Sequence, residues 1–338
     1  MAGPTGTATA TGKMALVERA TFTADKPHEV KERLKQLLGN GEVRMRDLER
    51  FTSFALTTIN QTLSGNYTGD VAKIESGLTR FYRHWIANNA IVETRVVKDI
   101  HATMLLAWKR KEIALIEGDF GRGKTKAANK FTALNDYAAF VTISGVSSAS
   151  ELLQRIGDAI NVHGLRGSRT DRLEEVIRAL QRVPRLIIID EADRLTPRIL
   201  TILQDLHGAG TERCGIVLIA TSQLRRMLEH PDLGYFKRRI TIYREIGDIT
   251  YGEAKQITDM WIHDLDGDDI KALWAYSLRG YGVATLVNVM MRAFDMHQLS
   301  GSKKITGEDL EAAYGLTMPL KDLPKGTKQE EEDEKEER

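Results

Sequence analysis

Cysteine, proline and long apolar runs are scarce in this 338-residue chain, which has one cysteine and seven prolines. The single cysteine, Cys214, cannot form an internal disulfide, which fits a reducing compartment and excludes a disulfide-stabilised scaffold. No apolar run approaches the roughly 18 to 20 residues that cross a bilayer. The segment from Met1 to Gly12 is small and polar. We therefore expect no secretory signal, no membrane partner and a cytoplasmic location.

Net charge is also small, at +1, but it is unevenly distributed along the chain. Residues 330–338 hold seven acidic side chains and two basic ones, a pattern typical of a solvated, disordered tail. A basic excess lies between Lys26 and Glu112, where there are fifteen lysines and arginines and ten acidic residues. An excess of this size permits contact with nucleic acid without requiring it.

The hydrophobic pattern divides the chain into three folded parts between two tails. From Val43 to Trp85 apolar residues recur at helical spacing, and Asp70 follows a turn-like glycine and can cap the next helix. Short apolar strands then alternate with helices, and from about Ile246 the pattern is helical again. We expect a flexible arm at 1–25, an all-helical domain at 26–87, an α/β domain at 88–245, a small helical domain at 246–320 and an acidic disordered tail at 321–338.

The strands expected in the middle part are short and continuously apolar. They are Ile113–Glu117, Phe140–Ile143, Leu186–Ile189 and Ile216–Ala220. Strands that are apolar on both sides and separated by amphipathic helices are typical of a parallel sheet covered by helices on both faces. The sequence therefore predicts an α/β fold for this part.

A phosphate-binding motif follows the first of these strands and opens a helix. Its residues fit G-x-x-x-x-G-K-[ST] at every fixed position: Gly118-Asp119-Phe120-Gly121-Arg122-Gly123-Lys124-Thr125. The glycines allow backbone N–H groups to surround phosphate oxygens, and the helix presents its positive end to the same anion. Lys124 is predicted to reach the β- and γ-phosphates of ATP and Thr125 to bind Mg²⁺. A bland glycine turn is the alternative.

Two acidic residues, Asp190 and Glu191, end the strand Leu186–Ile189. Carboxylates at this point lie at the carboxyl edge of a parallel sheet, where the phosphates are expected. Asp190 is predicted to hold Mg²⁺ and Glu191 to polarise the attacking water. Two surface acids that cap a strand are the alternative. Together, the two motifs indicate nucleotide hydrolysis.

The order of these parts resembles the AAA+ ATPases. The resemblance implies that Thr221 or Ser222, after the next strand, is a sensor of the γ-phosphate or the water, although a strand-end cap fits equally. It implies that the arginine finger lies in Lys237-Arg238-Arg239, at Arg239 or Arg238, although a basic surface is the alternative. It also implies a helical lid at 246–320. The lid segment Gly282–Leu286, where the family often places a sensor arginine, contains none, so this second sensor is either absent or displaced.

A narrower resemblance comes from the flanks of the motifs. Val92-Glu93-Thr94-Arg95 with Ile100 and Trp108, and later Leu203-Gln204-Asp205-Leu206-His207, are similar to the transposition target-selector ATPases of Mu-like phages and bacterial transposons. The similarity covers roughly Val43 to Leu316 and is weak in the lid.

The N-terminal helical domain contains a segment with the pattern of a DNA-binding motif. Residues 53–67 are similar to the helix-turn-helix of phage repressors, with Ile59 and Leu63 directed to the core. The polar face, suited to base edges or phosphates in a major groove, is Thr57, Thr58, Asn60 and Gln61. A plain three-helix core explains the same apolar spacing. A second basic segment, with Arg166, Arg169 and Arg172, is either a flexible loop that tracks phosphates or an exposed linker between helices.

The target-selector resemblance implies a function beyond hydrolysis. It implies an ATP- and Mg²⁺-dependent homo-oligomer, ring-like or a helical filament, that assembles on double-stranded DNA and recruits a transposase in the bacterial or phage-infected cytoplasm. Two other functions stay open. One is a replication helicase loader or initiator ATPase, and the other is an ATP-gated helix-turn-helix transcription regulator, which sequence-specific footprints would favour.

Overall fold

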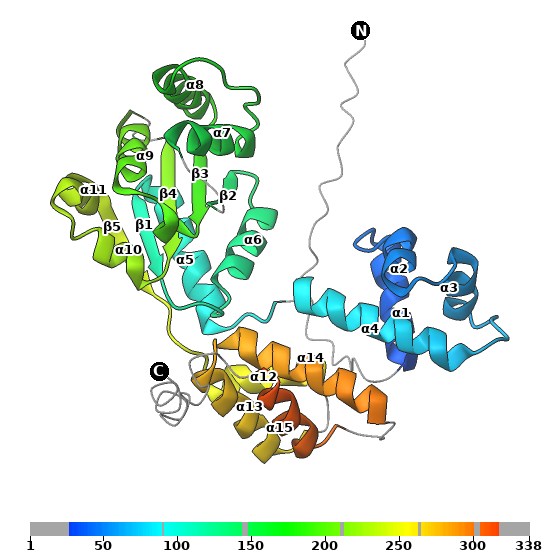
Figure 1. Ribbon diagram of the computed structural model, residues 1–338. Coiled ribbons are helices and arrows are strands. Elements are labelled where there is room, and N and C mark those ends of the chain that lie inside the picture. The colour runs from blue at the N-terminus through cyan, green and yellow to red at the C-terminus, as the bar shows by residue number, and fades with distance from the viewer. Residues whose placement is uncertain are drawn as a thin grey trace, which may run out of the picture.

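The computed structural model describes residues 27–89, 91–143, 148–209, 213–262, 265–300 and 305–317. The expected arm at 1–25 and tail at 321–338 lie outside these residues. The α/β module lies at the upper left, the N-terminal helices lie at the right and the C-terminal helices at the bottom, and the two helical parts lie next to each other (Figure 1). Within the described ranges, no helix is long and apolar enough to cross a membrane.

Four helices build the N-terminal domain: α1 (Pro27–Gly39), α2 (Met45–Thr52), α3 (Leu56–Leu63) and α4 (Val71–Asn89). Asp70 accepts a hydrogen bond from the backbone N–H of Lys73 at 3.1 Å, so the predicted cap of α4 is confirmed. Leu34, Leu48, Ile59 and Leu78 are fully buried where the four helices meet. A tight turn with Ser53 in the left-handed region joins α2 to α3.

A five-stranded parallel sheet forms the centre of the α/β module, in the order β2-β3-β4-β1-β5. Its strands are β1 (Ile113–Glu117), β2 (Ala138–Thr142), β3 (Arg185–Asp190), β4 (Cys214–Ala220) and β5 (Ile240–Glu245). The predicted parallel sheet is confirmed, and each of the four expected strands is present within two residues. β5 is an additional edge strand, and its mostly exposed residues explain the weak apolar signal.

Helices cover both faces of the sheet. One face packs against α5 (Arg95–Arg110) and α6 (Lys124–Leu134). The other face packs against the remaining helices of the module: α7 (Ala149–Ala159), α8 (Arg169–Arg182), α9 (Pro197–Ala209), α10 (Ser222–Met227) and α11 (Gly234–Arg239), with short 3₁₀ turns at Ala192–Arg194 and Pro231–Leu233. Along β1, Ile113 and Leu115 enter one core whereas Ala114 and Ile116 enter the other.

The C-terminal helices form the lid: α12 (Tyr251–Trp261), α13 (Gly267–Arg279), α14 (Val283–Ser300) and α15 (Gly307–Gly315). The lid shares one hydrophobic core with the N-terminal domain, and this core contains Leu78 and Phe81 of α4 as well as Met290 and Phe294 of α14. The N-terminal domain is therefore packed on the lid rather than on the sheet.

Candidate functional site

The phosphate-binding motif forms the predicted strand, loop and helix. β1 ends at Glu117, and α6 begins at Lys124 with Gly123 as its N-cap. Gly121 and Gly123 have φ angles of +76° and +83°, a region that L side chains rarely adopt. The glycine spacing is thus required by the backbone of the loop, and the open N-terminus of α6 is a site for an anion.

Lys124 is held inside this loop. Its Nζ donates hydrogen bonds to the carbonyl oxygens of Gly118, at 2.6 Å, and Asp119, at 2.8 Å. Burial lowers the pKa of the Lys124 ammonium below its ordinary value, and the nearby Asp190 carboxylate opposes this shift. Because further negative charge favours the protonated form, this buried ammonium is suited to bind phosphate.

Thr125 and Asp190, the two predicted magnesium ligands, lie together. The Thr125 hydroxyl donates a hydrogen bond to Oδ2 of Asp190 at 2.6 Å, and Asp190 is only 4% exposed. Hydroxyl and carboxylate oxygens fit Mg²⁺, which usually binds one or two carboxylates together with substrate phosphates. Among the described residues, no cluster of three or more His, Cys, Asp or Glu side chains that could hold a metal occurs.

Glu191 adopts an unusual backbone conformation at the end of β3. Its φ of +57° lies in the left-handed region, where a residue with a side chain is strained. Its backbone N–H donates to Oδ1 of Asp190 at 3.0 Å, and its Oε2 lies 3.1 Å from Nε of Arg194. This conformation places two consecutive acidic side chains at the same cleft.

The structure distinguishes between Thr221 and Ser222. Thr221 is buried after β4, caps α10, and donates a hydrogen bond from its hydroxyl to Oδ2 of Asp193 at 2.8 Å. Thr221 lines the cleft described next, whereas Ser222 does not. Asp193 was not among the predicted site residues, although it stands three positions after Asp190 and its carboxylate enters the same cleft.

A cleft of about 430 Å³ brings most of the predicted residues together. Its lining from the α/β module is Phe120, Gly121, Arg122, Gly123, Lys124, Thr125, Lys126, Asp190, Glu191, Asp193, Ile219, Ala220 and Thr221. The opposite wall is His84 of α4 together with Val283, Ala284, Val287, Asn288 and Met291 of α14. Gly118 and Asp119 support the loop without lining the cleft. The described part of the lid contributes no arginine to this lining.

A second, apolar cavity of about 70 Å³ adjoins the cleft at Gly123 and Lys126. Its lining joins the segment before α5 to the lid: Ile86, Ile91, Val92, Thr94, Val97, Arg122, Ile257, Met260, Trp261, Val283 and Val287. Apart from Arg122, which belongs to the phosphate-binding motif, these residues were not predicted as parts of a site, because helical apolar spacing in the lid indicates only a core.

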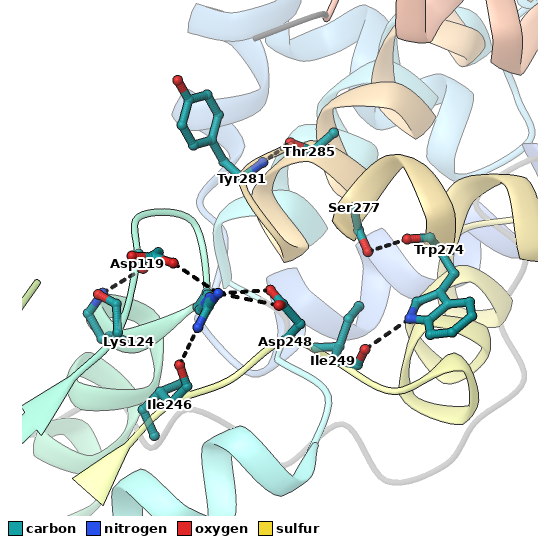
Figure 2. A network of polar contacts seen from close by, with 11 residues as sticks. Asp119, Lys124, Ile246, Asp248, Ile249, Trp274, Ser277, Tyr281 and Thr285 are labelled. Carbon is teal, nitrogen blue, oxygen red and sulfur yellow. Dashed lines mark hydrogen bonds and ion pairs between the residues drawn. The ribbon is translucent and has the colours of Figure 1, made fainter. Parts of the chain in front are cut away.

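Arg122 ties the phosphate loop to the start of the lid. Its guanidinium donates to the carbonyl oxygen of Ile246 at 2.6 Å and lies 2.9 Å from Asp119 and 3.2 Å from Asp248. Figure 2 shows Asp119, Ile246 and Asp248 around this group. The side chain is thus engaged in a contact between the loop and the lid, and its predicted role in phosphate binding stays a prediction.

Gly121 provides the closest approach between the loop and the lid. Its carbonyl oxygen accepts a hydrogen bond from the N–H of Ala284 at 3.0 Å, and an added Cβ would overlap the carbonyl oxygen of Tyr281. An added Cβ at Gly123 would meet nothing within 4 Å, although both glycines have positive φ.

We therefore expect Gly121→Ala to destabilise the protein more than Gly123→Ala. In both variants, a side chain in the left-handed region lowers the free energy of unfolding by about 1 kcal/mol or more. Only Gly121→Ala also displaces the lid. Thermal unfolding without nucleotide measures the difference, and equal melting temperatures for the two variants would show that the lid does not rest on this loop.

Arg238 and Arg239 lie at the end of the sheet away from the phosphate loop. Both are exposed, and Arg239 is the last residue of α11, directly before β5. Ile240 pairs with Ile113, the first residue of β1, whereas the phosphate loop follows Glu117, the last residue of β1. The two ends of β1 are about 13 Å apart at 3.3 Å per residue. Neither arginine lines the cleft of its own chain.

The predicted polar face of the helix-turn-helix is present on α3. Thr57, Asn60 and Gln61 are exposed and Thr58 is half-buried, whereas Ile59 on the opposite side is fully buried. Three arginines on or next to α2 are also exposed: Arg44, Arg46 and Arg50. A polar helix beside basic side chains can bind DNA, and DNA binding by these residues stays a prediction.

The expectation of either a flexible loop or an exposed linker between helices from Arg166 to Arg172 needs a correction for Arg169 and Arg172. Only Arg166 precedes the helix, since α8 begins at Arg169 and contains Arg172 in its first turn. The reason is a capping box, in which Ser168 accepts from the N–H of Asp171 and Asp171 accepts from the N–H of Ser168. The segment lies with α7 and α8 at the end of the module away from the lid (Figure 1).

Comparisons with known proteins agree with this geometry. Residues 107–228 match the family model described as an AAA domain. Among solved structures, the chain is similar to the ORC2 protein of Aeropyrum pernix in its ADP form, with a TM-score of 0.56, 16% identity, and coverage of 72% of this chain and 74% of the other. The ORC1 protein of the same organism, in complex with DNA, has a TM-score of 0.53 and 15% identity, covering 68% and 70%. These identities indicate a shared fold alone.

The fold and the site together define a parallel α/β module with a phosphate-loop cleft, which matches an AAA domain over residues 107–228, with an N-terminal helical domain and a C-terminal lid. More particularly, the chain is similar to the ATP-dependent target DNA activator B of Escherichia phage Mu and to that of phage D108, each at 23% identity over 300 residues. Each alignment covers 85% of this chain and 94% of the relative. The Mu-like prophage FluMu DNA transposition protein B of Haemophilus influenzae is also 23% identical, covering 75% and 92%.

Proposed function

We propose that this protein is an ATP-dependent DNA-binding ATPase that assembles on double-stranded DNA and recruits a transposase to its target. The observation that carries the proposal is the similarity to target DNA activator B over almost the whole length of both proteins. The similarity to origin-recognition proteins concerns the fold alone, so the initiator alternative is not favoured.

For hydrolysis, we assign complementary roles to the residues around the cleft. Lys124 and the N–H groups of the loop bind the β- and γ-phosphates. Thr125 and Asp190 hold Mg²⁺, which would neutralise charge on the phosphate oxygens. Glu191 accepts a proton from the attacking water, and Thr221, held by Asp193, positions that water or the γ-phosphate. The measured contacts that support this assignment are those of Thr125 with Asp190 and of Lys124 within the loop.

We place the purine base at the apolar cavity, where it adjoins the larger cleft. This cavity is small, lies beside the loop, and is lined by the segment before α5 and by α12 of the lid. A base there would contact both the module and the lid, so ATP would hold the two together. Val92 and Met260 are therefore proposed base contacts.

DNA binding is assigned to two surfaces. In the N-terminal domain these are Thr57, Thr58, Asn60 and Gln61 of α3, with exposed arginines beside them. On the module they are Arg166, Arg169 and Arg172. Because α3 is short and its exposed side chains are small and polar, most of the affinity is expected to come from phosphate contacts. Such contacts carry little sequence information.

We expect binding to random duplexes to be tolerant of sequence and steeply dependent on salt. If six or more phosphates are contacted, the affinity falls by about 10³-fold or more between 50 and 200 mM salt. Fluorescence anisotropy with duplexes of equal length and different sequence, in the presence of ATP, measures both properties. A strong preference for one short sequence would instead support the transcription-regulator alternative.

Recruitment of a transposase is tested by a different measurement. Protein assembled on DNA with ATP should retain its partner transposase, and protein without ATP should not. Retention of a replicative helicase in its place would support the loader alternative.

A further inference from the structure

Helix α4 belongs to the N-terminal domain but also borders the cleft of the ATPase module. Leu78 and Phe81 enter the core of the N-terminal domain. One turn further along, His84 lines the cleft that also contains Lys124 and Asp190. The side chain therefore brings the proposed DNA-binding domain to the proposed nucleotide site of the same chain.

The position of this part of α4 is fixed by the lid. The guanidinium of Arg83 lies 3.6 Å from the centre of the Phe294 ring on α14, and Arg83 is only 8% exposed. A cation over an aromatic face is attractive, and more so when desolvated. Helices α4 and α14 run side by side (Figure 1). His84 and the lid residues Asn288 and Met291 consequently form one wall of the cleft.

On its other side, His84 contacts the helix-turn-helix. Its ring centre lies 5.1 Å from that of Phe51, with the rings tilted by 35°. Phe51 in turn packs edge-on against Phe81 at 5.4 Å. Phe51 is the penultimate residue of α2, directly before the turn that leads to α3. A displacement of the His84 imidazole would therefore shift Phe51 and the adjacent turn, which orients the proposed recognition helix.

We propose that His84 contacts the phosphate chain of the bound nucleotide and thereby couples occupancy of the cleft to DNA binding by the N-terminal domain. This inference rests on the proposed function. His84 lines the cleft that contains Lys124 and is not in the lining of the apolar cavity, and an imidazole N–H can donate to a phosphate oxygen. If bound nucleotide raises the affinity for DNA, bound DNA must raise the affinity for nucleotide by the same factor.

The test measures the affinity of a fluorescent non-hydrolysable ATP analogue with and without a short random-sequence duplex. For the unchanged protein, we expect DNA to tighten binding of the analogue. For His84→Ala, we expect roughly tenfold weaker binding of the analogue, because one charge-assisted hydrogen bond is lost. We also expect DNA to have little remaining effect on that binding. His28→Ala is the matched control, because His28 is an exposed histidine on α1 of the same domain.

A second variant separates coupling from folding. His84→Gln keeps an N–H donor and should restore most of the coupling. If His84 had a purely structural role, DNA binding without nucleotide would be weakened in both variants, and that result would overturn the proposal. Unchanged coupling in His84→Ala would also overturn it while leaving the proposed function intact. Absence of ATP-dependent DNA binding in the unchanged protein would contradict the proposed function itself.

Discussion

Replacing Lys124 with alanine is expected to abolish ATP-dependent retention on DNA, whereas Glu191→Gln is expected to increase it. Lys124 is a buried ammonium at the phosphate loop, and its contacts with phosphate should contribute about 3 kcal/mol, or roughly 100-fold in ATP affinity. Glu191→Gln removes the proposed base and leaves the Thr125–Asp190 pair in place. Hydrolysis should fall by about 10²- to 10⁴-fold while ATP stays bound.

The two effects are separated by measuring ATP affinity, ATP turnover and the lifetime of the complex on DNA for each variant. Lys109→Ala, an exposed lysine on α5, controls for the general loss of positive charge. Thermal unfolding checks that Lys124→Ala, which loses two hydrogen bonds within the loop, is still folded. Equal loss of DNA retention in Lys124→Ala and Glu191→Gln would contradict the division of roles between them.

Local patterns in the sequence predicted the parts of the site that depend on local geometry. Gly121 and Gly123 were recognisable because the loop needs positive φ at both positions. Asp190 was recognisable because an acidic residue that ends an apolar strand must lie at the carboxyl edge of the sheet. The fold of the α/β module followed from the same short apolar runs, since strands buried on both faces leave little ambiguity.

The remaining residues depend on contacts between distant parts of the chain. His84 lies 40 positions before Lys124 in a different domain, so only the packing of α4 on the lid brings it to the cleft. In the sequence, the cavity residues Val92 and Met260 look like any apolar core residues. They line one cavity only because the lid packs near the segment before α5. Thr221 could not be separated from Ser222 until the cap of α10 and the bond to Asp193 were known.

The geometry of Arg239 limits how it can act. The cleft lies beyond the opposite end of β1, about 13 Å away, so Arg239 does not serve the site of its own chain. Its guanidinium packs on Gly208 near the end of α9, since an added Cβ there would lie 3.1 Å from Nη1. The side chain is exposed at this edge, where a neighbouring protomer on DNA could present its own cleft.

We therefore predict that Arg239→Ala binds ATP as a protomer but hydrolyses it poorly and assembles weakly on DNA. An arginine supplied to a transferring phosphoryl group contributes roughly 10³- to 10⁵-fold to the rate in related nucleotide hydrolases. The defect should be complemented by Lys124→Ala, because at a mixed interface one variant contributes an intact phosphate loop and the other an intact arginine. Arg238→Ala, measured in parallel, identifies which of the two exposed arginines acts. With mixed assembly shown by co-purification of differently tagged variants, ATPase activity no greater than the sum of the separate variants would rule out the assignment of Arg239.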